Sequence, residues 1–248
     1  HSVATTLNNL GWILHDKGDY AGAEEIHRRS LSLNREVQGN NQFSTAISLL
    51  QLARDVSAQG EYELADSLLR SSREIGVEIF GERHPFAATV EANLANLLSQ
   101  KGEVEAAAVA REKVLATMIS TVGENHRRTA AALYDLALTR RDLGDPDSAA
   151  SLIREALAIR RSILPPSHPT LHMTTAGLAS VMTEAGNAVD AESMLRKSYR
   201  KLSTELALDD WRIAYVRGEL GACLTSLGRY GEAEPLLLAS LETLRSRR

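Results

Sequence analysis

Short polar side chains recur along this chain at one fixed interval. Asn9, Gln51, Asn93 and Asp135 follow one another at steps of 42 residues. An amide carries both a donor and an acceptor, so a row of amides can hydrogen-bond the backbone of an extended peptide whatever its sequence. This row and its neighbours on the same helix face give the candidate partner-binding residues: Asn8, Asn9, Trp12, Gln51, Arg54, Asn93, Asn96, Tyr134 and Asp135. Two alternatives stay open: these residues only solvate an inner helical face, or Trp12 packs against a helix that precedes the sequence.

Three histidines at the same interval, His84, His126 and His168, raise the question of a metal site. Zinc requires ligand nitrogens about 2.0–2.1 Å from one ion, whereas successive helix pairs are separated by about 8–10 Å or more. The spacing therefore excludes a shared ion. We predict that these histidines begin helices, and we predict neither a metal nor a cofactor.

Candidate catalytic groups are few. Ser198 begins a Ser-x-x-Lys pattern, but it falls at a repeated position that we predict to lie on a packed helix face, and no partner motif follows. His15 and Asp16 are adjacent on a helix, so their side chains point about 100° apart and cannot form a dyad. Cys223 is expected in the core. We predict a protein without catalysis of its own.

The elements that position these residues form a repeat. A glycine, an alanine five residues later and a leucine eight residues earlier each recur every 42 residues: Gly18, Gly60, Gly102, Gly144, Gly186 and Gly228; Ala23, Ala65, Ala107, Ala149, Ala191 and Ala233; Leu10, Leu52, Leu94, Leu136, Leu178 and Leu220. Apolar residues spaced as on an amphipathic helix precede each glycine and follow it. Each copy is therefore predicted to be two helices, about 2–17 and 20–37 in the first copy, with glycine in the left-handed conformation at the turn.

Composition agrees with packed helices. The chain has 44% apolar residues, 4% aromatic residues and a net charge of -4, which argues against a nucleic-acid binder. No apolar run reaches the roughly 20 residues of a membrane span, and the single cysteine forms no internal disulfide. We expect a cytoplasmic protein and a single domain, 1–248, with copies at about 1–42, 43–84, 85–126, 127–168, 169–210 and 211–248.

Whole copies resemble a known family. The runs LNNLGWILHDKGDYAGAEEIHRRSL and LGACLTSLGRYGEAEPLLLASL, which begin at Leu7 and Leu220, are similar to tetratricopeptide repeats of the 42-residue kind found in kinesin light chains and many bacterial proteins. HEAT and armadillo arrays share the period, but the Gly-x-Tyr-x-x-Ala turn at Gly18, Gly60 and Gly228 favours the tetratricopeptide family. The inter-repeat His-Pro is weakened to His-Arg at 126–127 and replaced by Asp-Trp at 210–211.

The resemblance implies a fold and a function. The fold is an all-α, right-handed α-solenoid of six helix-turn-helix repeats and twelve helices, with the first helix of each pair on the concave wall. In the family, asparagines at this helix position hold bound peptides, which carries over to Asn9 and Asn93 directly and to Gln51 and Asp135 by similarity. The chain would be a scaffold that binds a protein or peptide segment, with no nucleic-acid or membrane partner.

Two other functions remain open. The last copy resembles terminal repeats of bacterial proteins in which the array follows a serine/threonine kinase domain, so the chain could be the sensor arm of such an enzyme. A further alternative is an assembly scaffold that acts through its end faces, where Leu237 and Leu241 are expected to be exposed. We expect the uncovered end faces to be capped by further chain or by self-association through the end repeats.

Overall fold

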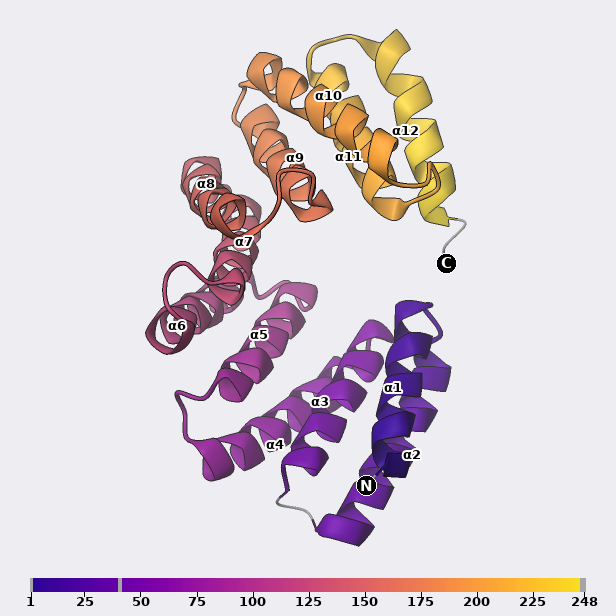
Figure 1. The fold of residues 1–248 in the computed structure, drawn as a ribbon, viewed down its shortest axis with the longest axis vertical. Coiled ribbons are helices and arrows are strands. Elements are labelled where there is room, and N and C mark those ends of the chain that lie inside the picture. Colours follow the sequence, from indigo (N-terminus) through magenta and orange to yellow (C-terminus); the bar gives the residue numbers. More distant parts are fainter. Residues whose placement is uncertain (1, 40–41, 246–248) are drawn as a thin grey trace. The chain divides into compact units, whose positions relative to one another are not determined.

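The computed structural model describes residues 2–39 and 42–245, which form twelve α-helices and no strand (Figure 1). The helices are α1 Ser2–Asp16, α2 Tyr20–Gln38, α3 Phe43–Ala58, α4 Tyr62–Phe80, α5 Pro85–Gln100, α6 Val104–Val122, α7 Arg127–Asp142, α8 Pro146–Ile163, α9 Pro169–Glu184, α10 Ala188–Glu205, α11 Trp211–Ser226 and α12 Tyr230–Arg245. The predicted all-α repeat of six helix pairs is confirmed. The chain divides into two compact units, residues 1–121 (unit 1) and 122–248 (unit 2), and each is described on its own.

The turn inside every pair has the predicted backbone. Gly18 and its five equivalents have φ between 74° and 86°, where a side chain would be strained. The backbone N–H of the following residue then bonds the carbonyl five residues back, as from Asp19 to Leu14 at 3.0 Å. The glycine therefore ends the first helix and turns the chain into the second.

Histidines begin helices, as predicted. Nδ1 of His84, His126 and His168 accepts a hydrogen bond from the backbone N–H two residues later, at 3.1–3.2 Å. In the last copy, which lacks the histidine, Asp210 accepts the same bond from Arg212 at 2.9 Å. Each side chain thus satisfies one of the donors that a helix start leaves without an intrahelical partner.

The two helices of a pair approach closely at small residues. The alanine that follows each turn glycine by five residues is at most 2% exposed in all six copies. A serine further along the second helix ties the pair together: Ser30 donates to the Ala4 carbonyl at 3.1 Å, Ser72 to Ala46 at 2.7 Å and Ser240 to Ala214 at 2.6 Å. Ser198, at the same repeat position, and Cys223 are buried as expected.

One repeated leucine departs from the expectation. Leu10 is 43% exposed, whereas Leu52, Leu136, Leu178 and Leu220 are buried. Leu52, Leu178 and Leu220 lie on helices that also contact the second helix of the preceding pair, and α1 has no such neighbour among the described residues. Leu237 and Leu241 of α12 are exposed, as predicted. Along the described residues, no helix is long and apolar enough to cross a membrane.

Candidate functional site

Unit 1 has a cavity of about 260 Å³ that is lined mainly by its first helices α1, α3 and α5, with Tyr20 of α2 and Leu69 of α4. Three of the predicted residues, Arg54, Asn93 and Asn96, line it together. Arg54 and Asn96 occupy the same position in successive copies, and Asn93 lies one turn earlier on the same helix face. The repeat therefore brings these side chains together although they are far apart in the chain.

Polar contacts hold the cavity wall. The Arg54 guanidinium donates to the Gln51 side-chain carbonyl at 3.1 Å, and the Asn93 amide donates to the Thr89 carbonyl at 2.8 Å. The side-chain carbonyl of Asn96 accepts from Arg111 at 2.9 Å. Arg54 has further N–H groups and Asn93 a carbonyl oxygen, so the wall offers both donors and acceptors.

The rest of the wall was missed by the sequence analysis. Ser57 donates to the side chain of Gln100 at 2.6 Å, and both line the cavity with His15 and Tyr20. His15 and Ser57 share a repeat position three residues after Trp12. Residues three apart on a helix share a face, so extending the polar rows by one turn would have found them.

A buried polar cluster lies behind this wall. Asp55 of α3 is 1% exposed and contacts His15 of α1 at 2.8 Å and His27 of α2. Burial opposes ionisation of Asp55, but the hydrogen bonds and charges of the two histidines outweigh it and lower its pKa. Nε2 of His27 lies 3.3 Å from the Asn8 carbonyl. The cluster thus joins three helices beneath the cavity.

Unit 2 has a second cavity, of about 490 Å³, on α7, α9 and α11. Its lining residues occupy the same repeat positions as the first: Arg141, Asp142, Ser180, Thr183, Glu184, Glu219 and Ala222. Three carboxylates face one guanidinium here, and Arg141 pairs with Asp142 at 2.9 Å. The same positions therefore build a cavity of amides and a cation in unit 1 and an acidic cavity in unit 2.

Glu219 is the most enclosed carboxylate of the second cavity. Burial raises its pKa, Glu184 raises it further, and the Ser180 hydroxyl and Arg141 lower it. A carboxylate whose pKa is raised by burial gains from a bound cation, because the cation replaces the lost water. This cavity consequently suits a basic group.

The remaining predicted residues differ in exposure. Asn9, Trp12 and Asp135 are exposed, and Gln51 is half-buried. Asn8 turns toward α3, where its amide lies 3.4 Å from the Ser48 hydroxyl. Asn8 therefore belongs to the packing between helices rather than to the cavity wall.

Tyr134 is also enclosed. It packs on Gly177 of α9, where a Cβ would overlap its hydroxyl, and hydrogen-bonds Tyr215 of α11. The Arg160 guanidinium lies 5.1 Å from the centre of its ring. Burial raises the pKa of Tyr134. Gly177 interrupts the amide row because Tyr134 fills the space that a side chain would need.

These helix pairs, turns and cavities define a helical-repeat protein. Residues 2–76, 44–119 and 86–162 each match the model of the tetratricopeptide repeat family, and together they span more than half of the chain. The chain belongs to this family, as its sequence indicated.

Solved structures share the fold. A kinesin light chain-like protein of Podospora anserina with nearly identical TPR-like repeats aligns with a TM-score of 0.67 and 22% identity, over 84% of this chain and 98% of its own. A Rap protein in complex with Competence and Sporulation Factor aligns with a TM-score of 0.71 and 14% identity, over 98% of this chain and 76% of its own. The Rap conjugation gene regulator of plasmid pLS20, in complex with the Phr* peptide, aligns with a TM-score of 0.72 and 11% identity, over 99% of this chain and 63% of its own. A comparison with curated proteins finds no match.

Proposed function

We propose that the chain is a non-catalytic scaffold that binds an extended segment of a partner protein through the first helices of its repeats. The observation that carries the proposal is the convergence of Arg54, Asn93 and Asn96 on one cavity of unit 1. Two of the similar structures are complexes, one with Competence and Sporulation Factor and one with the Phr* peptide. The shared fold supports a peptide as the ligand class.

The chemistry of unit 1 fits a peptide backbone. Each peptide unit has one N–H and one C=O, and the cavity wall has amide carbonyls to accept and amide and guanidinium groups to donate. Arg54 is half-buried and brings a positive charge to this wall. An acidic side chain or a terminal carboxylate of the partner would therefore pair with its guanidinium through two hydrogen bonds.

The chemistry of unit 2 fits a basic side chain. Asp142, Glu184 and Glu219 line its cavity with Arg141 as the only lining cation among the described residues. A lysine or arginine of the partner would enter this cavity with its charge compensated. The two cavities are therefore proposed to bind different parts of a partner, a peptide main chain in the cavity of unit 1 and a basic side chain in the cavity of unit 2, and each is tested separately.

A selection experiment tests the proposal. A displayed library of random peptides is enriched on the full chain, and the affinity of the enriched peptides is measured by fluorescence polarisation. The triple variant Arg54→Ala/Asn93→Ala/Asn96→Ala is expected to weaken them by at least about tenfold, which is about 1.4 kcal/mol. Arg29→Ala/Ser67→Ala/Glu78→Ala, at exposed positions of second helices, is the matched control.

Equal losses of peptide affinity in the two triple variants would show that the cavity of unit 1 is not the binding site. Loss of binding through charges placed at Leu237 or Leu241 alone would favour assembly through the end faces. Glu184→Gln/Glu219→Gln tests unit 2 separately, because it should weaken only peptides with a lysine or arginine. A ligand-dependent change in an attached enzyme would identify the regulatory-arm alternative.

A further inference from the structure

A third cavity lies away from the first-helix face. It encloses about 910 Å³ in unit 2, between the end of α8, the start of α9 and the length of α10. Its apolar lining comes from Leu164, Pro166, Leu171 and Met194. This volume lies within the range of about 300–1,000 Å³ that is typical of small-molecule sites.

The cavity coincides with a break in the repeat. The position of His172 is a buried alanine in the five other copies: Ala4, Ala46, Ala88, Ala130 and Ala214. That alanine lies where the two helices of a pair touch, and its carbonyl accepts the serine bond in three copies. In copy five, no such bond joins Ser198 to His172 within the described chain. An imidazole ring therefore stands between α9 and α10 at a position where the other copies have a methyl group.

A second packing position is also changed. Lys201 stands where the other copies have leucine, isoleucine or threonine: Leu33, Ile75, Thr117, Ile159 and Thr243. An imidazole and an ammonium thus replace small or uncharged groups at one helix seam. Departures from an otherwise consistent pattern are expected at functional sites.

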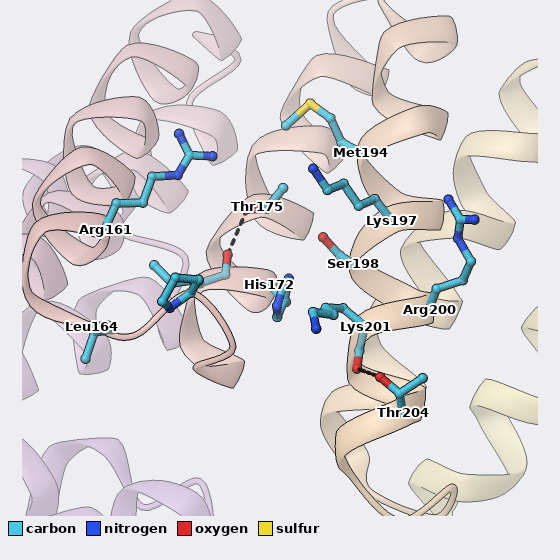
Figure 2. Close-up of a pocket in the computed structure, with 12 residues that line it drawn as sticks. Arg161, Leu164, His172, Thr175, Met194, Lys197, Ser198, Arg200, Lys201 and Thr204 are labelled. Atoms are coloured by element: carbon cyan, nitrogen blue, oxygen red, sulfur yellow. Dashed lines mark hydrogen bonds between the residues drawn. The ribbon is translucent and has the colours of Figure 1, made fainter.

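The cavity presents positive charge. Figure 2 shows Lys197 and Lys201 extending from α10 toward α9. Arg161 of α8 also lines the cavity. Arg200 adds a fourth cation to the lining, and no carboxylate is among the described lining residues. Lys201 also pairs with Glu205 at 3.4 Å, outside the lining. The charge of the cavity is complementary to an anion.

His172 adds a donor. Its Nε2 is buried without a hydrogen-bond partner in the described part of the chain. Burial lowers the pKa of His172; Glu205 acts in the opposite sense, and Lys201 and Lys197 lower the pKa further. A neutral imidazole with its proton on Nε2 would satisfy this atom by donating to an anionic oxygen.

We propose that this cavity binds a small amphiphilic anion, with a carboxylate or phosphate head between Lys197, Lys201 and His172 and an apolar chain against Leu164, Leu171 and Met194. The lining side chains are mostly donors and apolar groups. A peptide backbone would need acceptors for its N–H groups as well, so an amphiphile fits better. This site is independent of the proposed peptide cavities.

Calorimetric titration of the full chain tests this site. The probes are decanoate and decyl phosphate below micelle formation, decyltrimethylammonium as the charge control, and inorganic phosphate as the head group alone. We expect one molecule of either decyl anion per chain, and binding at least about tenfold weaker for the other two probes. The relative affinities of decanoate and decyl phosphate show whether the site prefers a carboxylate or a phosphate head group.

Variants locate the binding. Lys197→Gln/Lys201→Gln should weaken the decyl anions at least about tenfold, whereas Arg128→Gln/Arg154→Gln, which removes two exposed cations elsewhere in unit 2, should change affinity less than about twofold. His172→Ala restores the residue of the other copies, so it should weaken binding without lowering Tm. Equal binding of the cationic probe, equal effects of both charge variants, or tighter binding of an acidic leucine-containing peptide would overturn the proposal.

Discussion

His27 of α2 and Asp55 of α3 form a buried polar pair, and both side chains are 1% exposed. Asp55 also contacts His15 of α1, so one carboxylate connects the first three helices. The pair lies next to the cavity of unit 1, because His15, which contacts Asp55, also lines that cavity. Asp55 therefore links the packing of the first three helices to a residue of the cavity wall.

Replacing this carboxylate should destabilise unit 1. Asp55→Ala leaves two imidazoles without their acceptor, and breaking a buried pair in this way costs about 3–5 kcal/mol. Urea unfolding followed by circular dichroism measures the loss. Asp66→Ala, which removes the half-buried partner of the exposed Arg70, is the control and should cost less than about 1 kcal/mol. A similar loss in both variants would contradict a structural role for the buried pair.

The contribution of Asp55 should vanish in acid. Its pKa is lowered in the folded state, so ionised Asp55 stabilises the fold above its unfolded pKa of about 3.9. That stabilisation is lost as the pH falls through the lower, folded pKa. The difference in unfolding free energy between the parent and Asp55→Asn should therefore be smaller at about pH 3 than at about pH 5. A difference that grows over this interval would contradict the direction of the shift.

Gly177 should not tolerate a side chain. A Cβ there overlaps the Tyr134 hydroxyl, so Gly177→Ala is expected to destabilise unit 2 by about 1–3 kcal/mol. Adding Tyr134→Phe removes the hydroxyl and should recover part of the loss, which thermal unfolding of the single and double variants measures. Gly231→Ala is the control, since no atom lies within 4 Å of its added Cβ. Without recovery in the double variant, the overlap would not be the cause.

The helices, their turns and their starts were predictable because each depends on residues close in the chain. Gly18 and its equivalents fix the turns, and His84 and its equivalents cap the following helices. Every copy has the glycine, and three copies begin with the histidine, at His84, His126 and His168. The helix pairs were therefore predicted with nearly the observed ends.

The candidate site was predictable only in part. Arg54, Asn93 and Asn96 were found because their rows follow the repeat, but the pairing of Asp55 with His15 and His27 needs three helices to meet. Helix periodicity places His15 next to Asp16 but cannot show that His15 contacts Asp55, which is 40 residues away in the chain. Tyr134 was predicted as a partner-binding residue, and its contact with Gly177 of α9 could not be seen by counting along one helix.

The tie between a second-helix serine and the carbonyl of a first-helix alanine has a consequence for how such a chain diversifies. Ser30, Ser72 and Ser240 make the same joint in copies with different surface residues. Copies one, two and six are thus expected to accept changes at their outward-facing residues, which would alter what the chain recognises while this joint between their helices stays as it is.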